Sequence, residues 1–480
     1  MNNSVVKGFT WKLLERFGVQ GVQFLLQIVL ARLLSPEHYG VLAIMIIFVN
    51  LANVFIQSGF NTALIQGKDV DDDDYSSVFW VSLLIAGVLY TVIFFASPLI
   101  GQFYDMPDIV TPMRVIALML FPGSLNSIQL AKASRDLDFK KIFVSNLGGI
   151  VVSGIVGIII AVQGGGLWAL VVQTMLNIFV ASLVMLFTVK WHPTLVFKPK
   201  RVKKLFTFGW KLLVSSLIET LYLDIQSLVV GKKYDSETLG FYNKGKQFPQ
   251  FLIGAINGAV QSVMLPVMSK HQDSKSEVKT LTRQSISLSS YVIFPMMAGL
   301  AAVATPLVSL LLTDKWLPCV PYLQIYCVSF AFWPIHTSNL QAINALGRSD
   351  LFLKLEIIKK SYGLIAIVIA VACFDSPIAI AATAVVTGLL SFFVNAFPNK
   401  KLLGYSFFEQ LKDIMPQFLL SAAVFAAAMG VSLLGLPNIL TILLQIVVGV
   451  AVYVLGSAIF RLQSFKTLLG LIKSILKKRK

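Results

Sequence analysis

Charged residues are scarce in this chain of 480 residues: they make up 13% of it, whereas hydrophobic residues make up 56%. Soluble domains carry about a quarter charged residues, so this composition excludes a water-soluble protein and predicts an integral membrane protein. The three cysteines, Cys319, Cys327 and Cys373, have no CxxC spacing, which argues against a disulfide framework or a metal site. Because a Ser/His/Asp constellation, a phosphate-binding glycine loop with lysine and an HExxH motif are also missing, we expect no enzyme, no cofactor and no metal.

Apolar runs of about 20 residues, the length that crosses a bilayer, fill nearly the whole chain. Fourteen such runs can be assigned between residues 10 and 460, which leaves no room for a sizeable soluble domain. The first run lacks the cleavage site of a signal peptide, so we expect it to be retained. The fold predicted is an all-α integral membrane protein with about 14 transmembrane helices.

The net charge of +17 is unevenly distributed, because most lysines and arginines fall in gaps on one side of the predicted membrane. The positive-inside rule then places both the N- and the C-terminus in the cytoplasm, and the charge needs no nucleic-acid partner. Four lysines break the pattern on the predicted outer side, namely Lys232, Lys233, Lys244 and Lys246.

A polar stripe runs along the first apolar segment and recurs about 200 residues later. The first copy contains Lys12, Arg16, Gln20, Gln23 and Gln27, which fall within roughly 80° of one another on a helix. Trp210-Lys211-Leu212-Leu213 repeats Trp11-Lys12-Leu13-Leu14, and the stripe continues through Glu219. Ser35-Pro36-Glu37-His38-Tyr39-Gly40 likewise matches Ser236-Glu237-Thr238-Leu239-Gly240.

Two similar halves of six helices each are therefore expected. Since six is even, both halves enter the membrane from the same side, and the repeat is parallel. The predicted parts are an N-terminal lobe at 1–198, a C-terminal lobe at 199–398, helices 13 and 14 at 399–462, and an amphipathic basic tail at 463–480.

Polar side chains within spans are the candidate substrate-binding residues, because such groups are costly in lipid unless they face water or each other. Arg16 could hold a phosphate through its planar fork of donors. Amide stripes suit the hydroxyls of a sugar chain, although hydrogen bonds between helices are the simpler explanation. The candidates are Arg16, Lys12, Gln20, Gln23, Gln27, Asn50, Asn53, Gln57, Asn257 and Gln261.

Two acidic residues are candidates for coupling to a cation or a proton. Glu219 lies on the repeated stripe, and Asp224 points away from it by about 140°. Pairing with an arginine or a lysine would be a structural alternative for either one. The acidic run formed by Asp69 and residues 71–74 is interpreted as a solvated loop.

Several motifs of this chain resemble polysaccharide flippases of the Wzx type, within the multidrug/oligosaccharidyl-lipid/polysaccharide exporter superfamily. The motifs are Ser35-Pro36-Glu37-His38-Tyr39-Gly40, Arg135-Asp136-Leu137-Asp138-Phe139-Lys140-Lys141, Leu239-Gly240-Phe241-Tyr242-Asn243-Lys244, Met264-Leu265-Pro266-Val267-Met268-Ser269 and Asn344-Ala345-Leu346-Gly347-Arg348-Ser349-Asp350. The resemblance covers nearly the whole chain.

The resemblance implies two six-helix lobes in a V, with two extra C-terminal helices and a cationic cavity between the lobes. It further implies alternating-access transport of undecaprenyl-pyrophosphate-linked oligosaccharide to the outer leaflet of the bacterial inner membrane, for cell-surface polysaccharide or lipopolysaccharide synthesis. The expected partners are that substrate, the bilayer and other polysaccharide assembly proteins. Glu219 departs from a purely cationic cavity, and coupling to proton, sodium or membrane potential stays open.

Two other functions are weighed against the flippase. A multidrug cation antiporter of the same superfamily should carry acids where this chain has Arg16. A membrane glycan polymerase or ligase needs a large outer loop with catalytic side chains, and the predicted outer loops are short.

Overall fold

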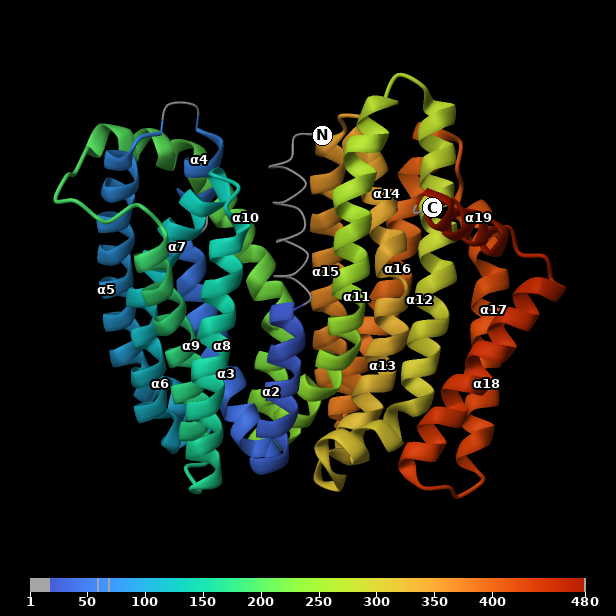
Figure 1. The fold of residues 1–480 in the computed structure, drawn as a ribbon, viewed down its shortest axis with the longest axis horizontal. Helices are drawn as coiled ribbons and strands as arrows, with labels where there is room; N and C mark the ends of the chain where they lie inside the picture. Colours follow the sequence, from blue (N-terminus) through green and yellow to red (C-terminus); the bar gives the residue numbers. More distant parts are fainter. Residues whose placement is uncertain (1–17, 58–59, 68–69, 479–480) are drawn as a thin grey trace. The chain divides into compact units, whose positions relative to one another are not determined.

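The protein is built from α-helices joined by short turns (Figure 1). The computed structural model describes residues 18–57, 60–67 and 70–478, and no strand occurs among them. The first part of the chain holds α2 (Gln20–Leu33), α3 (Pro36–Gln57), α4 (Phe60–Gln66), α5 (Asp72–Phe103), η2 (Pro107–Ile109), α6 (Val110–Ile116), η3 (Ala117–Met119), α7 (Leu120–Arg135), α8 (Phe139–Val162), α9 (Leu167–Thr188) and α10 (Pro199–Lys233). The second part holds α11 (Ser236–Lys270), α12 (Lys275–Leu312), η4 (Asp314–Cys319), α13 (Val320–Ala331), α14 (Trp333–Ala345), α15 (Ser349–Cys373), α16 (Pro377–Leu403), α17 (Phe407–Ser432), α18 (Asn438–Ile459) and α19 (Gln463–Lys478).

Eleven helical stretches in the described part of the chain are long and apolar enough to cross a membrane. They confirm the prediction of an all-helical integral membrane protein. Three further segments are less clear: α2 has 14 described residues, α13 and α14 are separate helices, and α15 carries five charged residues in its first half. The count of fourteen spans therefore stays a prediction.

The chain divides into two compact units, of which unit 1 ends at Gly240 and unit 2 begins at Phe241. The order of elements repeats: α5, η2, the broken helix α6–α7, α8 and α9 in unit 1 correspond to α12, η4, the broken helix α13–α14, α15 and α16 in unit 2. By its contacts α10 belongs to unit 1, where it lies against α3, α4 and α5. The predicted boundaries follow the sequence repeat instead, and they stay predictions.

The two copies of the motif ending in glycine meet each other in unit 1. A Cβ on Gly40 would overlap the carbonyl oxygen of Ser236, and a Cβ on Gly240 would overlap that of Pro36. The contact is thus reciprocal between the start of α3 and the start of α11. Only glycine allows two backbones to approach this closely, which explains why both copies of the motif end in it.

A proline inside α5 explains the position of an arginine in the membrane. Pro98 has no amide hydrogen, so the carbonyl oxygen of Phe94 loses its helical donor. Arg114 Nε supplies a donor to that oxygen at 3.2 Å and also lies 3.0 Å from Ser97 Oγ. Its guanidinium covers the Phe94 ring at 4.1 Å. Arg114 therefore stabilises the kink-prone turn of α5.

The spans differ widely in how much of their surface other helices cover. In α12, 56% of the most apolar stretch is buried, whereas the figure for the stretch in α10 is 11%. Hydrophobic residues that face lipid are normal in a membrane protein, so exposure alone does not disfavour the fold. The difference shows that α12 is a central helix of unit 2, while α10 is a peripheral helix of unit 1.

The three cysteines are also placed differently. Cys319 and Cys327 are buried in unit 2, as expected for small hydrophobic residues, but Cys373 at the end of α15 is exposed.

Candidate functional site

The polar stripe of the first segment is described only in part. Lys12 and Arg16 lie outside the described residues, so their predicted roles stay predictions. Gln20 is exposed on α2, and Gln23 and Gln27 are half-buried. α2 packs mainly against α8.

The second stripe lies on α3, between α5, α7, α9 and α10. Asn50 is exposed, whereas Asn53 and Gln57 are half-buried. Asn53 sits close to α7, because a Cβ on Gly123 would lie 3.4 Å from Asn53 Oδ1. One end of this stripe is therefore available to a ligand, while Asn53 also has a packing role.

The acidic candidates lie on α10, the least buried span. Glu219 is exposed and Asp224 is half-buried. Both take part in polar contacts with other groups of the protein.

The candidates in unit 2 have two different environments. Asn257 of α11 is buried, and its Oδ1 accepts a hydrogen bond of 2.6 Å from Thr337 Oγ1 of α14. Gln261, one turn further along α11, is exposed. Asn257 thus joins two helices, which is the structural role weighed for the amide stripes, and Gln261 is the residue of the pair that can meet a ligand.

Residues 71–74 of the acidic run are not a solvated loop, so the prediction is wrong for them, and Asp69 lies outside the described residues. Asp71 caps α5 together with Asp74 in a reciprocal capping box, and Asp72–Asp74 form its first turn. Favourable interaction with the helix dipole explains why acids gather there. Asp74 is buried, with only 5% of its side chain exposed.

Basic residues from α7 and α10 neutralise this run. Lys132 Nζ lies 2.7 Å from Asp72 Oδ1, and Lys198 pairs with Asp73. Arg201 Nη1 bridges Asp71 at 2.6 Å and Asp74 at 2.8 Å. We call these seven residues the clasp: Asp71, Asp72, Asp73, Asp74, Lys132, Lys198 and Arg201.

Two opposing effects act on the pKa of Asp71 in the clasp. Its slight burial raises the pKa, but the hydrogen bond from the Asp74 amide and the Arg201 guanidinium together lower it below its ordinary value. The clasp therefore holds Asp71 ionised in the folded state.

In unit 2 a row of polar contacts joins α12 to α17 at successive turns. Lys279 lies 3.4 Å from Glu409, Arg283 lies 2.5 Å from Asp413, and Ser287 accepts a hydrogen bond of 3.3 Å from Gln417. One turn further, Tyr291 of α12 bonds Ser457 of α18 at 2.9 Å, and its carbonyl oxygen accepts from Tyr453 at 2.6 Å. We call this row of contacts the ladder.

A cluster of buried amides also ties α17 to unit 2. Asn339 Oδ1 of α14 accepts from Asn399 Nδ2 of α16 at 2.7 Å and from Gln410 Nε2 of α17 at 3.0 Å. All three side chains are fully buried. Asn339 therefore connects α14 to both α16 and α17.

Sequence reasoning missed charged residues in the middle of α15. Glu356 and Lys359 form an ion pair of 2.5 Å, with 24% and 14% of their side chains exposed. The Nδ1 atom of His336, on the neighbouring α14, is buried and has no hydrogen-bond partner among the described residues. The signal was present, because Lys354, Glu356, Lys359 and Lys360 interrupt an apolar segment, and such groups are functional candidates by default.

The lysines on the predicted outer side differ in their surroundings. Lys232 lies 3.1 Å from Asp105, just beyond the far end of α5. Lys244 is buried beside the Trp316 ring at 5.5 Å, and Lys246 lies 5.7 Å from the Tyr326 ring centre.

Because α10 starts beside the start of α5 and ends beside its end, the two helices run parallel.

Comparison with known proteins gives consistent matches. Residues 29–321 match a family described as "Polysaccharide biosynthesis protein". The chain is 25% identical to the teichuronic acid biosynthesis protein TuaB of Bacillus subtilis (strain 168), over 80% of this chain and 79% of that protein. It is 24% identical to the lipopolysaccharide biosynthesis protein WzxC of Escherichia coli (strain K12), over 91% and 89%. Among solved structures, the lipid II flippase MurJ in an inward closed conformation has the same fold, with a TM-score of 0.75, 18% identity, and coverage of 97% of this chain and 100% of that one.

Proposed function

The chain belongs to the polysaccharide biosynthesis protein family, and from this premise we propose that it carries a polyprenyl-pyrophosphate-linked oligosaccharide across the bacterial cytoplasmic membrane. The observation that carries the proposal is the alignment of nearly the whole chain with WzxC, a lipopolysaccharide biosynthesis protein. The family match agrees with it. The fold shared with a lipid II flippase agrees with this function. The protein is then a transporter for cell-surface polysaccharide and performs no covalent chemistry.

The substrate has a charged part, a sugar part and a lipid part, and each needs a different surface. Arg16 and Lys12 are the proposed contacts of the pyrophosphate, because a guanidinium forks onto phosphate oxygens. The amides of Gln20, Asn50 and Gln261 are exposed and suit sugar hydroxyls. The lipid chain stays in the bilayer, where the exposed hydrophobic side chains already face.

In the proposed transport, the substrate-binding site opens alternately to the two sides of the membrane. The distribution of basic residues predicts cytoplasmic termini and supports loading of the substrate from that side. When the inside of the cell is electrically negative, moving an anion outward is favourable by about 2.3 kcal/mol per charge per 100 mV. The membrane potential can therefore drive the step, and Glu219 is the proposed residue for coupling to a proton or to sodium.

The decisive experiment measures flipping directly. The purified protein is reconstituted into liposomes with a fluorescent polyprenyl-pyrophosphate oligosaccharide, and a membrane-impermeant quencher reports the fraction in the outer leaflet. We expect rapid exchange with the wild type, a loss of at least about tenfold in Arg16→Ala and a partial loss in Arg16→Lys. Lys200→Ala serves as the matched control, because Lys200 is an exposed basic residue next to the clasp.

Two results would contradict the proposal. Wild-type flux in both Arg16 variants would remove Arg16 from the site. Competition by organic cations, with no exchange of the labelled glycolipid, would favour the multidrug cation antiporter instead.

A further inference from the structure

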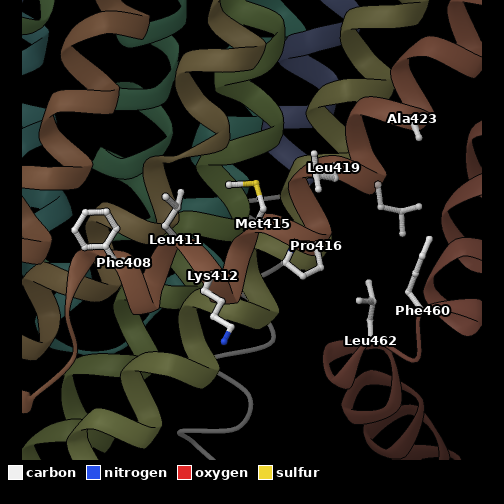
Figure 2. Close-up of a pocket in the computed structure, with 10 residues that line it drawn as sticks. Phe408, Leu411, Lys412, Met415, Pro416, Leu419, Ala423, Phe460 and Leu462 are labelled. Atoms are coloured by element: carbon white, nitrogen blue, oxygen red, sulfur yellow. The ribbon is translucent and has the colours of Figure 1, made fainter.

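An apolar groove opens on unit 2 between α17 and the turn that leads from α18 to α19, with a volume of about 810 Å³. Leu411, Met415, Leu419 and Ala423 line it from α17, and Phe460 and Leu462 line it from the turn (Figure 2). Phe408 and Ala423 lie at the two ends of the lining on α17, and the charged side chain of Lys412 lies one turn from Phe408. A groove with an apolar length and a cationic end has the chemistry of a lipid-binding site.

We propose that this groove binds an anionic phospholipid, with one acyl chain along α17 and the phosphate near Lys412 and Arg461. The proposal is independent of the transported substrate and concerns a lipid of the surrounding bilayer. Three observations carry it: the apolar stretch of the groove beyond Lys412, the charges of Lys412 and Arg461, which are unpaired within the described residues, and the backbone at Arg461.

The groove is long enough for one acyl chain. Its lining on α17 runs from Phe408 to Ala423, fifteen residues or about 22 Å at 1.5 Å per residue. The stretch from Lys412 to Ala423 accounts for about 16 Å of it, and half of a bilayer core is about 15 Å. An acyl chain whose phosphate lies at Lys412 would therefore fit along α17, whereas a long polyprenyl chain would extend beyond the lining.

The charge at the end of the groove is not neutralised by the protein. The two acids beside Lys412 on α17 are already paired, Glu409 with Lys279 and Asp413 with Arg283. Neither Lys412 nor Arg461 forms an ion pair within the described part of the chain, and both are exposed. Two cations next to an apolar groove therefore favour a ligand with a phosphate over a neutral one.

The backbone at Arg461 gives the second sign that its side chain matters. α18 ends in a turn in which Leu462 N bonds Ser457 O at 3.0 Å and Arg461 N bonds Ala458 O at 3.2 Å. Arg461 has φ +50°, at the position where helix ends prefer glycine because other residues are strained there. Arginine is less favourable than glycine at this position, so a favourable interaction of its charged side chain with a ligand would explain why arginine is present.

The amphipathic helix after the turn marks the level of the membrane surface. Leu462, Phe465 and Leu468 pack against Tyr291, Leu420, Val424 and Tyr453, while Lys466 is exposed. A helix of this kind lies in the interface, at the depth of the headgroups. Arg461 precedes it directly, so the phosphate of a bound lipid would lie at the level expected for a headgroup.

The experiment titrates the purified full-length protein in neutral detergent micelles with phosphatidylglycerol or with phosphatidylcholine of the same chains. Bound lipid is counted by native mass spectrometry, and the melting temperature is followed, because a ligand of the folded state raises it. We expect phosphatidylglycerol to bind more tightly than phosphatidylcholine, and Lys412→Gln with Arg461→Gly to weaken it by roughly tenfold or more. Ala423→Phe, which fills the groove and keeps both charges, should weaken both lipids.

The controls separate a site from general attraction to basic protein. Lys466→Gln removes an exposed charge outside the groove and should leave binding within about twofold of wild type. Arg461→Gly alone should unfold at the same or a higher temperature without lipid, because the strained φ is relieved. A loss of lipid binding in this variant cannot then be ascribed to misfolding.

Three outcomes would overturn the proposal. Equal binding of the two lipids would show that the cations select nothing. An equal effect of Lys466→Gln would reduce the site to general surface charge. Displacement of phosphatidylglycerol by equimolar polyprenyl phosphate, lost in the same variants, would assign the groove to the transported lipid.

Discussion

Two corresponding pairs of helices are held together in opposite ways. In unit 1 the start of α5 carries the acids and the start of α10 carries the bases of the clasp. In unit 2 the start of α12 carries the bases, and α17 carries the acids of the ladder. Since like charges repel, the start of α10 would be repelled by the start of α12, and α17 by α5. The opposite arrangement of charges in the two pairs thus favours the pairing of α5 with α10 and of α12 with α17, in a chain whose halves are similar.

The two pairs also differ in how far the polar contacts extend. The clasp ends within the first turns of α5 and α10, and much of α10 beyond it has little cover. The ladder extends from Lys279 to Tyr291, about three turns of α12, and the amide cluster adds a further connection. We infer that α17 is fixed to unit 2, whereas α10 is held mainly at its two ends. Four variants test this comparison.

The largest effect is expected at the far end of α10, where the chain turns into α11. Gly40→Ala puts a methyl group onto the carbonyl oxygen of Ser236, and backbone cannot move aside as a side chain can. We expect a loss of about 3 kcal/mol or more in unfolding free energy, measured by denaturant titration in mixed micelles. Gly87→Ala in α5 is the control, because its added methyl group meets nothing within 4 Å. Equal stability of the two variants would contradict the close contact.

The buried amide cluster should give the next largest effect. Asn339→Ala removes the acceptor of two buried donors, those of Asn399 and Gln410, which should cost about 2–3 kcal/mol. Ser127 lies on α7, the counterpart of α14 in unit 1, and within the described part of the chain its hydroxyl donates to Asn61 Oδ1 at 2.8 Å. Ser127→Ala should therefore cost about 1 kcal/mol in the same titration. A larger cost for Ser127→Ala would reverse the ranking of the two units.

The capping boxes offer a matched test of the clasp and the ladder, because Asp74 and Glu409 hold the same third position in α5 and α17. Asp74 is buried and bonded to Arg201, so Asp74→Ala should cost about 2 kcal/mol. Glu409 is 47% exposed, and Glu409→Ala should cost less than about 1 kcal/mol. Similar costs would show that burial does not separate the two sites.

The smallest effect concerns the pH dependence of the clasp. The pKa of Asp71 is lowered in the folded protein, so its ion pair contributes stability above its ordinary pKa of about 4 and loses it as the pH falls further. The melting temperature of the wild type should decline more steeply below about pH 4 than that of Asp71→Asn. Parallel curves for the two proteins would exclude Asp71 as the titrating group.

Composition and periodicity were sufficient to predict the helical membrane fold, because a bilayer leaves few alternatives for the backbone. They were also sufficient to find the motif ending at Gly40 and Gly240, although its reason, a reciprocal backbone contact, needed the structure. The acidic run was misjudged because its partners, Lys132 and Arg201, are distant in sequence. Asn257 could be singled out as polar, but only Thr337 beside it reveals that it joins two helices.

The meeting of Gly40 and Gly240 has a mechanical consequence. Where two backbones touch with no side chains interleaved between them, a change in their crossing angle requires no rotamer to flip and no cavity to open. Such a contact opposes a change in the crossing angle only weakly, whereas a methyl group on either glycine would oppose it strongly. Because each glycine meets the backbone of the other copy of the motif, a substitution at either glycine disturbs both surfaces.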